Sequence, residues 1–275
     1  MEKLTAKLSV LEEPYHLAAD QIAFYRENRY IKLKQALPPE ALNYYAGVIH
    51  DKVKELNTMY LPLEERDTYS QAFLQVMNLW RKSEEIKRLV FSKRLARIAT
   101  ELMGVRGVRL YHDQALFKEP GGGFTPWHAD QYYWPLSNDH TVTVWIPLQE
   151  TPQDMGPLEF SAQSHRLNNG RSLKISDESE KQIERMLRKG NFQHIVEPFE
   201  LGEVSFHSGW LFHRAGANTT DQMRRVMTVI YMDQDMELKT PENDNQQADW
   251  ETWCPGAKVG ALIDTPLNPV LYSSR

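Results

Sequence analysis

The first residues of this sequence that could do chemistry are His128 and Asp130, in the stretch Thr125–Tyr132. They are separated by one position, so on an extended strand both side chains leave the same face and can bind one ion. A histidine and a carboxylate from one strand, with a second histidine from elsewhere, form the set of ligands that suits non-haem Fe(II) and leaves open positions on the metal. Alone, the pair is a weak signal, because a surface strand can carry both residues by chance.

A second group of candidate residues lies far along the chain, in the segment Leu201–Asn218. This segment contains His213, and Arg224 follows His213 by eleven positions, at the start of the next predicted strand. We expect a hairpin between His213 and Arg224 to carry both side chains into the mouth of one barrel. His213 would then complete the metal site that the first pair opens.

The composition limits the class of protein. The chain has 275 residues, of which 41% are hydrophobic, enough for one large core without a second domain. A formal charge of -5 argues against nucleic acid or an anionic membrane as the main partner. No apolar run is long enough to cross a bilayer, and residues 1–8 lack the apolar core of a signal peptide. The single Cys254 rules out an internal disulfide and fits a reducing compartment, so we expect a cytoplasmic protein.

Residues 1–104 are predicted to form a helical layer. Apolar residues recur at helical intervals over Leu17–Tyr25, and Tyr30–Leu33 alternates like a short strand. Pro38 and Pro39 open a helix that runs to about Leu56, because proline is tolerated in a first turn. Two more helices are expected after the capping serines at positions 83 and 92.

Residues 105–235 are predicted to be mostly β. Short apolar segments separated by turn residues recur from Val108 onward, which is typical of a β-sandwich or barrel. With a metal site inside, we favour a double-stranded β-helix, the cupin-like jelly roll. Residues 166–196 form an insertion whose Asp177–Lys189 portion predicts a short amphipathic helix. Residues 236–275 are a C-terminal extension, and the whole chain, 1–275, forms one domain flanked by helices.

Several linked motifs resemble the phytanoyl-CoA dioxygenase family of Fe(II)- and 2-oxoglutarate-dependent oxygenases. That family has an H-x-D motif, a distal H-x5-N-x5-R motif, and a lead-in of glycine, an acidic residue, an apolar residue, any residue, phenylalanine and histidine. The same motifs occur here in the same order, as His128-Ala129-Asp130, as the lead-in at residues 202–207, and as His213, Asn218 and Arg224. The resemblance covers roughly Ile22 to Pro269, nearly the whole chain.

The resemblance implies a role for each matched residue. His128, Asp130 and His213 would ligate Fe(II). Arg224 would bind the distal carboxylate of the cosubstrate 2-oxoglutarate, where its planar fork can form two charge-assisted hydrogen bonds. Gln114 and Trp145 match positions that contact 2-oxoglutarate in the family, although each also suits the interior of a barrel.

The sequence departs from the family at one position beside the metal. Ala215 stands where the family usually has a small residue, often serine, that can bond to 2-oxoglutarate. Arg225 is a rival to Arg224, but adjacent strand residues face opposite ways and the spacing favours Arg224. We expect His207 to be an interior residue near the site rather than a ligand, and His112 to be structural.

The function that this resemblance implies is a dioxygenase that uses O2 to hydroxylate an unactivated C–H bond of a small-molecule metabolite, with succinate and CO2 as co-products. The carboxylate of Asp130 argues against halogenation, because halogenating relatives have a small residue there. Two alternatives stay open: a cupin-type metalloenzyme that does not use 2-oxoglutarate, and a non-catalytic small-molecule-binding relative. The sequence does not identify the substrate or the oligomeric state. We expect the insertion to act as a lid over the substrate.

Overall fold

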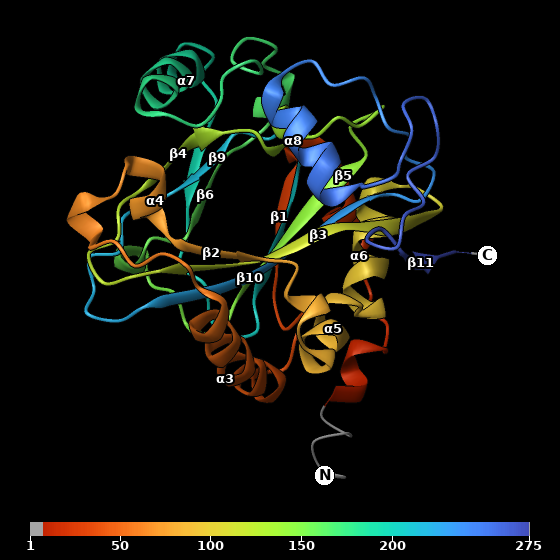
Figure 1. Ribbon diagram of the computed structural model, residues 1–275, viewed down its shortest axis with the longest axis horizontal. Helices are drawn as coiled ribbons and strands as arrows, with labels where there is room; N and C mark the ends of the chain where they lie inside the picture. The colour runs from red at the N-terminus through yellow and green to blue at the C-terminus, as the bar shows by residue number, and fades with distance from the viewer. Residues whose placement is uncertain (1–7, 275) are drawn as a thin grey trace.

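The computed structural model describes residues 8–274 (Figure 1). The interpretation of residues 1–8 as lacking a signal peptide falls, apart from Leu8, outside this range. None of the helices between residues 8 and 274 combines the length and the apolar character that crossing a bilayer requires.

The larger of the two sheets has seven strands, and every strand pair in it is antiparallel. Its order is β1-β8-β5-β10-β3-β11, and β2 also pairs with β3. The strands are β1 (Tyr30–Leu33), β2 (Leu74–Met77), β3 (Gly107–Lys118), β5 (Thr141–Pro147), β8 (Val204–Ser208), β10 (Arg224–Asp233) and β11 (Val270–Ser273).

The smaller sheet has four strands in the order β4-β9-β6-β7, again antiparallel. These strands are β4 (Thr125–His128), β6 (Leu158–Ser161), β7 (His194–Val196) and β9 (His213–Ala215). A cluster of buried side chains that includes Trp145 and Val226 from the large sheet and Phe160 from the small one joins the two sheets. Two antiparallel sheets that share one interior confirm the predicted jelly roll.

The N-terminal helices cover the other face of the large sheet. The helices are α2 (Ala19–Asn28), α3 (Pro39–Leu56), α4 (Thr68–Ala72), α5 (Glu84–Val90), α6 (Lys93–Met103), α7 (Asp177–Lys189) and α8 (Asp244–Trp253). Of these, α7 and α8 lie elsewhere. The main hydrophobic core lies between the N-terminal helices and this sheet, and it includes Ile49 of α3, Ile98 of α6 and Val229 of β10. In Figure 1, α3, α5 and α6 lie together on one side of the molecule, away from β4, β6 and β9.

Local sequence signals explain where these helices begin. The side chains of Ser83 and Ser92 accept hydrogen bonds from the backbone N–H groups three residues later, at the starts of α5 and α6. Pro39 occupies the first turn of α3, as predicted, and α7 has the predicted bounds, Asp177–Lys189.

The segment around the H-x-D motif differs from the prediction. A strand was expected over about Trp127–Tyr133, but β4 ends at His128 and residues 130–133 form a 3-10 helix, η4 (Asp130–Tyr133). Ala129 between them keeps an extended backbone, with φ -124° and ψ 126°. The two candidate ligands are therefore still separated by one extended residue, although the strand itself stops at the first of them.

Candidate metal centre and cosubstrate pocket

Three side chains converge between the sheets at the end of β4. His128 ends β4, Asp130 begins η4 and His213 begins β9. β4 and β9 pair in antiparallel register with His128 opposite His213, so the two histidines are neighbours across the ladder. One candidate ligand atom from each of the three residues lies within 4.8 Å of the other two. This spacing fits a single metal ion bound on one face.

Backbone carbonyl groups orient both histidine rings. The Nδ1–H of His128 donates to the carbonyl oxygen of Pro126 at 2.7 Å, and that of His213 donates to the carbonyl oxygen of Leu211 at 3.0 Å. Since a carbonyl can only accept, Nε2 of each ring carries the free lone pair. Both Nε2 atoms face Oδ1 of Asp130, at 3.5 and 3.6 Å. Metal-binding histidines use the same arrangement to select the tautomer and fix the ring.

The second carboxylate oxygen of Asp130 is also held in place. The hydroxyl of Thr143 on β5 donates to Oδ2 at 3.2 Å, and Nε2 of His207 on β8 lies 3.4 Å from the same oxygen. The His207 contact is an approach rather than a hydrogen bond, because neither ring nitrogen of His207 forms one with the described residues. His207 is thus beside the site and points at Asp130 instead of joining the two histidines as a ligand.

The pKa shifts of Asp130 and His213 favour the forms of these groups that bind a metal. Burial raises the pKa of Asp130, but the surrounding histidines, chiefly His213, outweigh burial and hold this pKa well below its ordinary value. Burial and the neighbouring His128 lower the pKa of His213 well below its ordinary value. An ionised carboxylate beside a neutral imidazole is the state in which both groups ligate a cation.

Arg224 lies at the start of β10 and is 1% exposed. Its Nη1 donates to the carbonyl oxygen of Gly156 at 2.5 Å, its Nε has no hydrogen-bond partner among the described residues, and the guanidinium lies 5.5 Å from the centre of the Trp145 ring. Burial lowers the pKa of Arg224 to about 9, so the group stays positive at neutral pH. No carboxylate within residues 8–274 forms an ion pair with it. A buried cation without a counterion is a site for an anionic ligand.

The alternation of side chains along β10 places Arg224 and Arg225 on opposite faces of the strand. Along β10, Arg224 and Thr228 line the cavity between the sheets, whereas Met227 and Val229 pack in the core under the helices. Arg225 points away from the cavity, and its Nε donates to Oε1 of Gln149 at 2.7 Å. Arg224 is therefore the arginine that the structure places near the three candidate ligands.

The predicted hairpin between His213 and Arg224 is wrong. His213 belongs to β9, which pairs with β4 and β6 in the small sheet, and Arg224 belongs to β10, which pairs with β3 and β5 in the large sheet. The chain crosses from one sheet to the other between them. Both residues line the same cavity, so the expected proximity arises from sheets that face each other.

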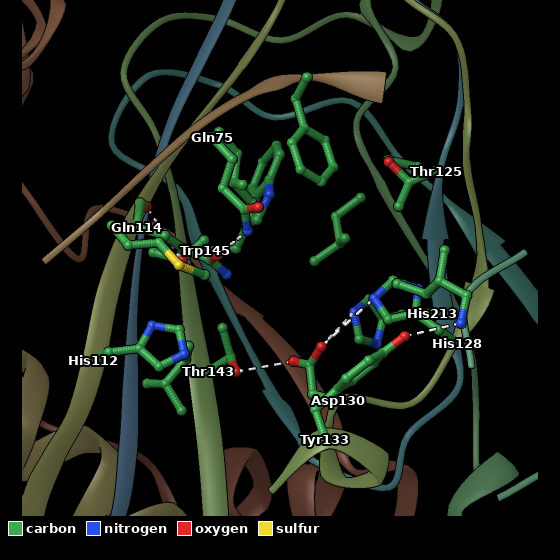
Figure 2. Close-up of a pocket in the computed structure, with 18 of the residues that line it drawn as sticks. Gln75, His112, Gln114, Thr125, His128, Asp130, Tyr133, Thr143, Trp145 and His213 are labelled. Carbon is green, nitrogen blue, oxygen red and sulfur yellow. Dashed lines mark hydrogen bonds and ion pairs between the residues drawn. The ribbon is translucent and has the colours of Figure 1, made fainter. Parts of the chain in front are cut away.

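Gln114 and Trp145 both line this cavity, from β3 and β5. The side-chain oxygen of Gln114 accepts a hydrogen bond from Nε2 of Gln75 on β2 at 2.6 Å, which pairs two amides on the cavity wall. The centre of the Trp145 ring lies 5.5 Å from the guanidinium of Arg224 and 4.8 Å from the centre of the Phe199 ring. Figure 2 shows Gln75 and Gln114 on the side of the pocket away from His128 and His213.

The cavity has a volume of about 430 Å³ and extends well beyond the candidate ligands. Tyr133 and Trp134 line it, whereas Trp127 packs under α7. Two contributors to the cavity wall were not predicted from the sequence. His112, expected to be structural, lines the cavity wall, and so does α8 from the C-terminal extension, for which no helix was predicted.

These residues fit a metal ion together with 2-oxoglutarate. Two oriented imidazole nitrogens and one ionised carboxylate are the donor set that suits Fe(II), with open positions toward the cavity. The cosubstrate carries a carboxylate at its far end, and Arg224, whose Nε has no hydrogen-bond partner among the described residues, lines the same cavity. At the position of the family's serine, Ala215 lines the cavity without a polar group.

A jelly roll that holds two histidines and one carboxylate in this arrangement defines the class of non-haem iron oxygenases. The chain belongs to the phytanoyl-CoA dioxygenase (PhyH) family, whose model matches residues 25–226. The family resemblance that the motifs predicted is therefore confirmed.

Curated relatives agree with this family. A probable alpha-ketoglutarate-dependent hypophosphite dioxygenase of Stutzerimonas stutzeri is 24% identical over 155 residues, which is 54% of this chain and 53% of that protein. Phytanoyl-CoA dioxygenase domain-containing protein 1 of Danio rerio is 28% identical over 167 residues, covering 57% of this chain and 56% of that protein. The alignments span about half the length of these relatives.

Solved structures share the fold. The alpha-ketoglutarate-dependent carbocyclase SnoK from nogalamycin biosynthesis superposes with a TM-score of 0.75 at 23% identity, covering 94% of this chain and 99% of that chain. The epimerase SnoN, solved with Fe3+, alpha-ketoglutarate and nogalamycin RO, has a TM-score of 0.76 at 22% identity over 92% of this chain and 98% of that chain. EctD from S. alaskensis, solved with 2-oxoglutarate and 5-hydroxyectoine, has a TM-score of 0.69 at 17% identity over 93% of this chain and 91% of that chain.

Proposed function

We propose that this protein is an Fe(II)- and 2-oxoglutarate-dependent dioxygenase that hydroxylates an unactivated C–H bond of a small-molecule metabolite. The observation that carries the proposal is the pairing, in one cavity, of the His128–Asp130–His213 cluster with the buried, unpaired Arg224. The cluster alone would suit many metalloenzymes, but the arginine adds a binding site for a second, anionic molecule.

Each residue has a defined task. The imidazoles of His128 and His213 and the carboxylate of Asp130 would hold the metal, while Thr143 helps to fix the orientation of the carboxylate. Arg224 would fix the distal carboxylate of the cosubstrate by charge-assisted hydrogen bonds. When bound, iron with 2-oxoglutarate and O2 supplies the oxidising power, and succinate and CO2 are released as co-products.

The protein also has to place the substrate carbon near the metal and keep water away. Tyr133 and Trp134 wall the cavity next to the candidate ligands, and Lys174 and Ile175 from the insertion line it as well. The Tyr133 hydroxyl accepts a hydrogen bond from the backbone N–H of Ile175 at 2.8 Å, which joins the insertion to η4. We propose that this segment, residues 166–176, is the part of the insertion that covers the substrate.

Hydroxylation is preferred to halogenation for one reason. Asp130 is present and accepts a hydrogen bond from Thr143, so its carboxylate would occupy the position that a halide needs on the metal. SnoK and SnoN are described as a carbocyclase and an epimerase, so the fold is also used for other oxidative outcomes.

The test is a screen of a metabolite library for substrate-dependent succinate release in the presence of Fe(II), ascorbate and 2-oxoglutarate. We expect release to require both iron and 2-oxoglutarate, to be abolished in Asp130→Ala, and to be accompanied by a product heavier by one oxygen atom. Metal-dependent conversion of a substrate without consumption of 2-oxoglutarate would instead support the cupin-type metalloenzyme. Binding of metal and 2-oxoglutarate without turnover of any compound would support a non-catalytic relative.

A further inference from the structure

One face of α8 forms a wall of the cavity. Asn245, Asp249 and Trp253 follow one another at four-residue spacing, so they lie on the same side of the helix, and all three line the cavity. α8 packs against η4, the short helix that begins with Asp130. The C-terminal extension is thereby part of the same chamber as the candidate metal ligands.

Asp249 is a carboxylate without a counterion. Its Oδ2 accepts a hydrogen bond from the hydroxyl of Tyr111 at 2.9 Å, and no lysine, arginine or histidine among residues 8–274 forms an ion pair with it. Burial raises the pKa of Asp249 to about 7. A cation in the cavity would lower the pKa of Asp249 again, because an opposite charge nearby favours the ionised carboxylate.

The groups around Asp249 also suit a cation with several N–H donors. Nδ1 of His112, a side chain that is 4% exposed, has no hydrogen-bond partner among the described residues, and burial lowers the pKa of His112 to about 4, so its ring is neutral and offers one acceptor nitrogen. The Nδ2 of Asn245 donates to the hydroxyl of Tyr132, which leaves its amide oxygen free to accept. Figure 2 shows His112 across the pocket from His128 and His213.

Aromatic rings complete this end of the cavity. The ring of Trp253 lies 4.8 Å from the ring of His112, and Tyr69, Phe73 and Tyr133 line the same space. Aromatic faces attract ammonium groups through their quadrupoles. A carboxylate, two neutral acceptors and aromatic walls together match a protonated amine better than they match an anion or a hydrocarbon.

The balance of charge in the loaded site leads to the same ligand. A divalent metal and Arg224 together carry three positive charges, and Asp130 with the doubly negative cosubstrate carries three negative charges. Of the other charged residues that line the cavity, Arg214 is paired with Glu159 and Glu180, whereas Asp249 and Lys174 have no ion-pair partner among the described residues. Lys174 also lines the cavity, but it is exposed and no ion pair joins it to Asp249.

We propose that Asn245, Asp249 and Trp253 form the recognition site for a protonated amine of the substrate, so that the enzyme acts on an amine-bearing small molecule. This inference rests on the proposed oxygenase function for the role of the bound molecule, but the binding of an amine can be measured without turnover.

The experiment uses matched probes that differ in charge. Benzylamine, benzyl alcohol and benzoate have the same ring and similar size, and their binding to the protein loaded with Mn(II) and 2-oxoglutarate is followed by ligand-observed NMR without oxygen. We expect benzylamine to bind about tenfold or more tightly than the other two. Asp249→Asn, which can still accept from Tyr111, should abolish this preference, and Asp249→Glu should restore part of it. The matched control is Glu251→Gln, which removes an exposed carboxylate of the same helix that bonds only to Gln247.

The outcomes separate this inference from the proposed function, because binding of Mn(II) and 2-oxoglutarate is measured in the same samples. If both ligands bind but benzylamine shows no advantage, or its advantage survives in Asp249→Asn, the amine site is refuted and the oxygenase proposal stands. If 2-oxoglutarate does not bind at all, the oxygenase proposal fails, while the amine preference can still be scored on the unloaded protein. The melting temperatures of the Asp249 variants are compared with that of Glu251→Gln. If they are equal, the loss of the preference for benzylamine is not caused by unfolding.

Discussion

At the scale of single residues, the candidate metal site depends on the orientation of two histidine rings and of one carboxylate. The backbone carbonyls of Pro126 and Leu211 leave Nε2 of both histidines free, and Thr143 fixes the far oxygen of Asp130. These partners lie within two residues of each histidine or on the neighbouring large sheet, so groups of the chain itself orient all three candidate ligands.

Replacing a candidate ligand should therefore cost metal affinity without unfolding the protein. We expect His213→Ala and Asp130→Ala to weaken Fe(II) or Mn(II) binding by about 100-fold or more, since changes to the outer partners of a metal ligand alone cost about 10- to 100-fold. Anaerobic calorimetric titration measures the loss. His194→Ala, a half-exposed histidine paired with Glu159, should keep full affinity. Wild-type affinity in both ligand variants would place the metal elsewhere.

A second prediction at this scale concerns the two adjacent arginines. Arg224→Lys keeps a charge in the cavity but loses the fork that binds both oxygens of a carboxylate, so the KM for 2-oxoglutarate should rise by roughly ten- to a hundredfold with metal affinity unchanged. Arg225→Lys, whose parent side chain bonds to Gln149 outside the cavity, is the matched control and should change KM little. The assignment fails if Arg225→Lys is the more damaging variant.

At the scale of elements, the insertion has two parts with different roles. The amphipathic helix α7 joins a core, because its Ile183 and Leu187 are buried in a cluster with Trp127, Ala129 and Phe212. Glu180 also ties α7 to both ligand-bearing strands, as it accepts hydrogen bonds from the backbone N–H of Trp127 and from Nη1 of Arg214, each at 2.5 Å. α7 thus packs behind β4 and β9 and stabilises their position, whereas residues 174 and 175 line the cavity.

Removing the hydrogen bonds between Glu180 of α7 and these strands should lower the stability of the protein. Glu180→Ala leaves the backbone N–H of Trp127 and the guanidinium of Arg214 without their partner, so we expect the free energy of unfolding to fall by about 1–3 kcal/mol in urea titrations. Glu184→Ala, which breaks an exposed pair with Arg188 on the same helix, should cost about 0.5 kcal/mol or less. Equal losses in the two variants would show that α7 is held only loosely to the sheet.

At the scale of the whole molecule, the cavity joins two sheets that contribute different groups. The small sheet and η4 provide the three candidate metal ligands, and the large sheet provides Arg224, Gln114 and Trp145. A molecule bound to both the metal and Arg224 would therefore link the sheets across the interior. Metal alone would be held only on one side.

This division predicts additive and separable stabilisation by the two ligands. Saturating 2-oxoglutarate, at about a hundredfold excess over its Kd, should add roughly 2.7 kcal/mol to the metal-loaded protein and raise Tm by about 5–10 °C. In Arg224→Lys the rise caused by Mn(II) should remain, and the further rise caused by 2-oxoglutarate should shrink or vanish. Differential scanning calorimetry measures both steps. A cosubstrate effect that is the same in Arg224→Lys would contradict the bridge between the sheets.

The sequence by itself determined the kind of fold and most of the candidate site. Short apolar segments separated by turn residues predicted β3, β5 and β10, capping serines located α5 and α6, and one-residue spacing brought His128 and Asp130 together, because these signals depend on neighbours along the chain. The motif spacing also selected Arg224 over Arg225. The roles of these residues in binding iron and 2-oxoglutarate remain predictions.

Only the tertiary structure decided what depends on residues far apart in the sequence. His213 and Arg224 meet across two sheets rather than in a hairpin, since the chain changes sheets between β9 and β10. His112 and the face of α8 enter the cavity because the C-terminal extension folds back over η4, although the four-residue spacing of Asn245, Asp249 and Trp253 was visible in the sequence. The periodicity of the sequence shows which residues share one face of a helix or strand. The packing of the whole chain decides which other residues that face contacts.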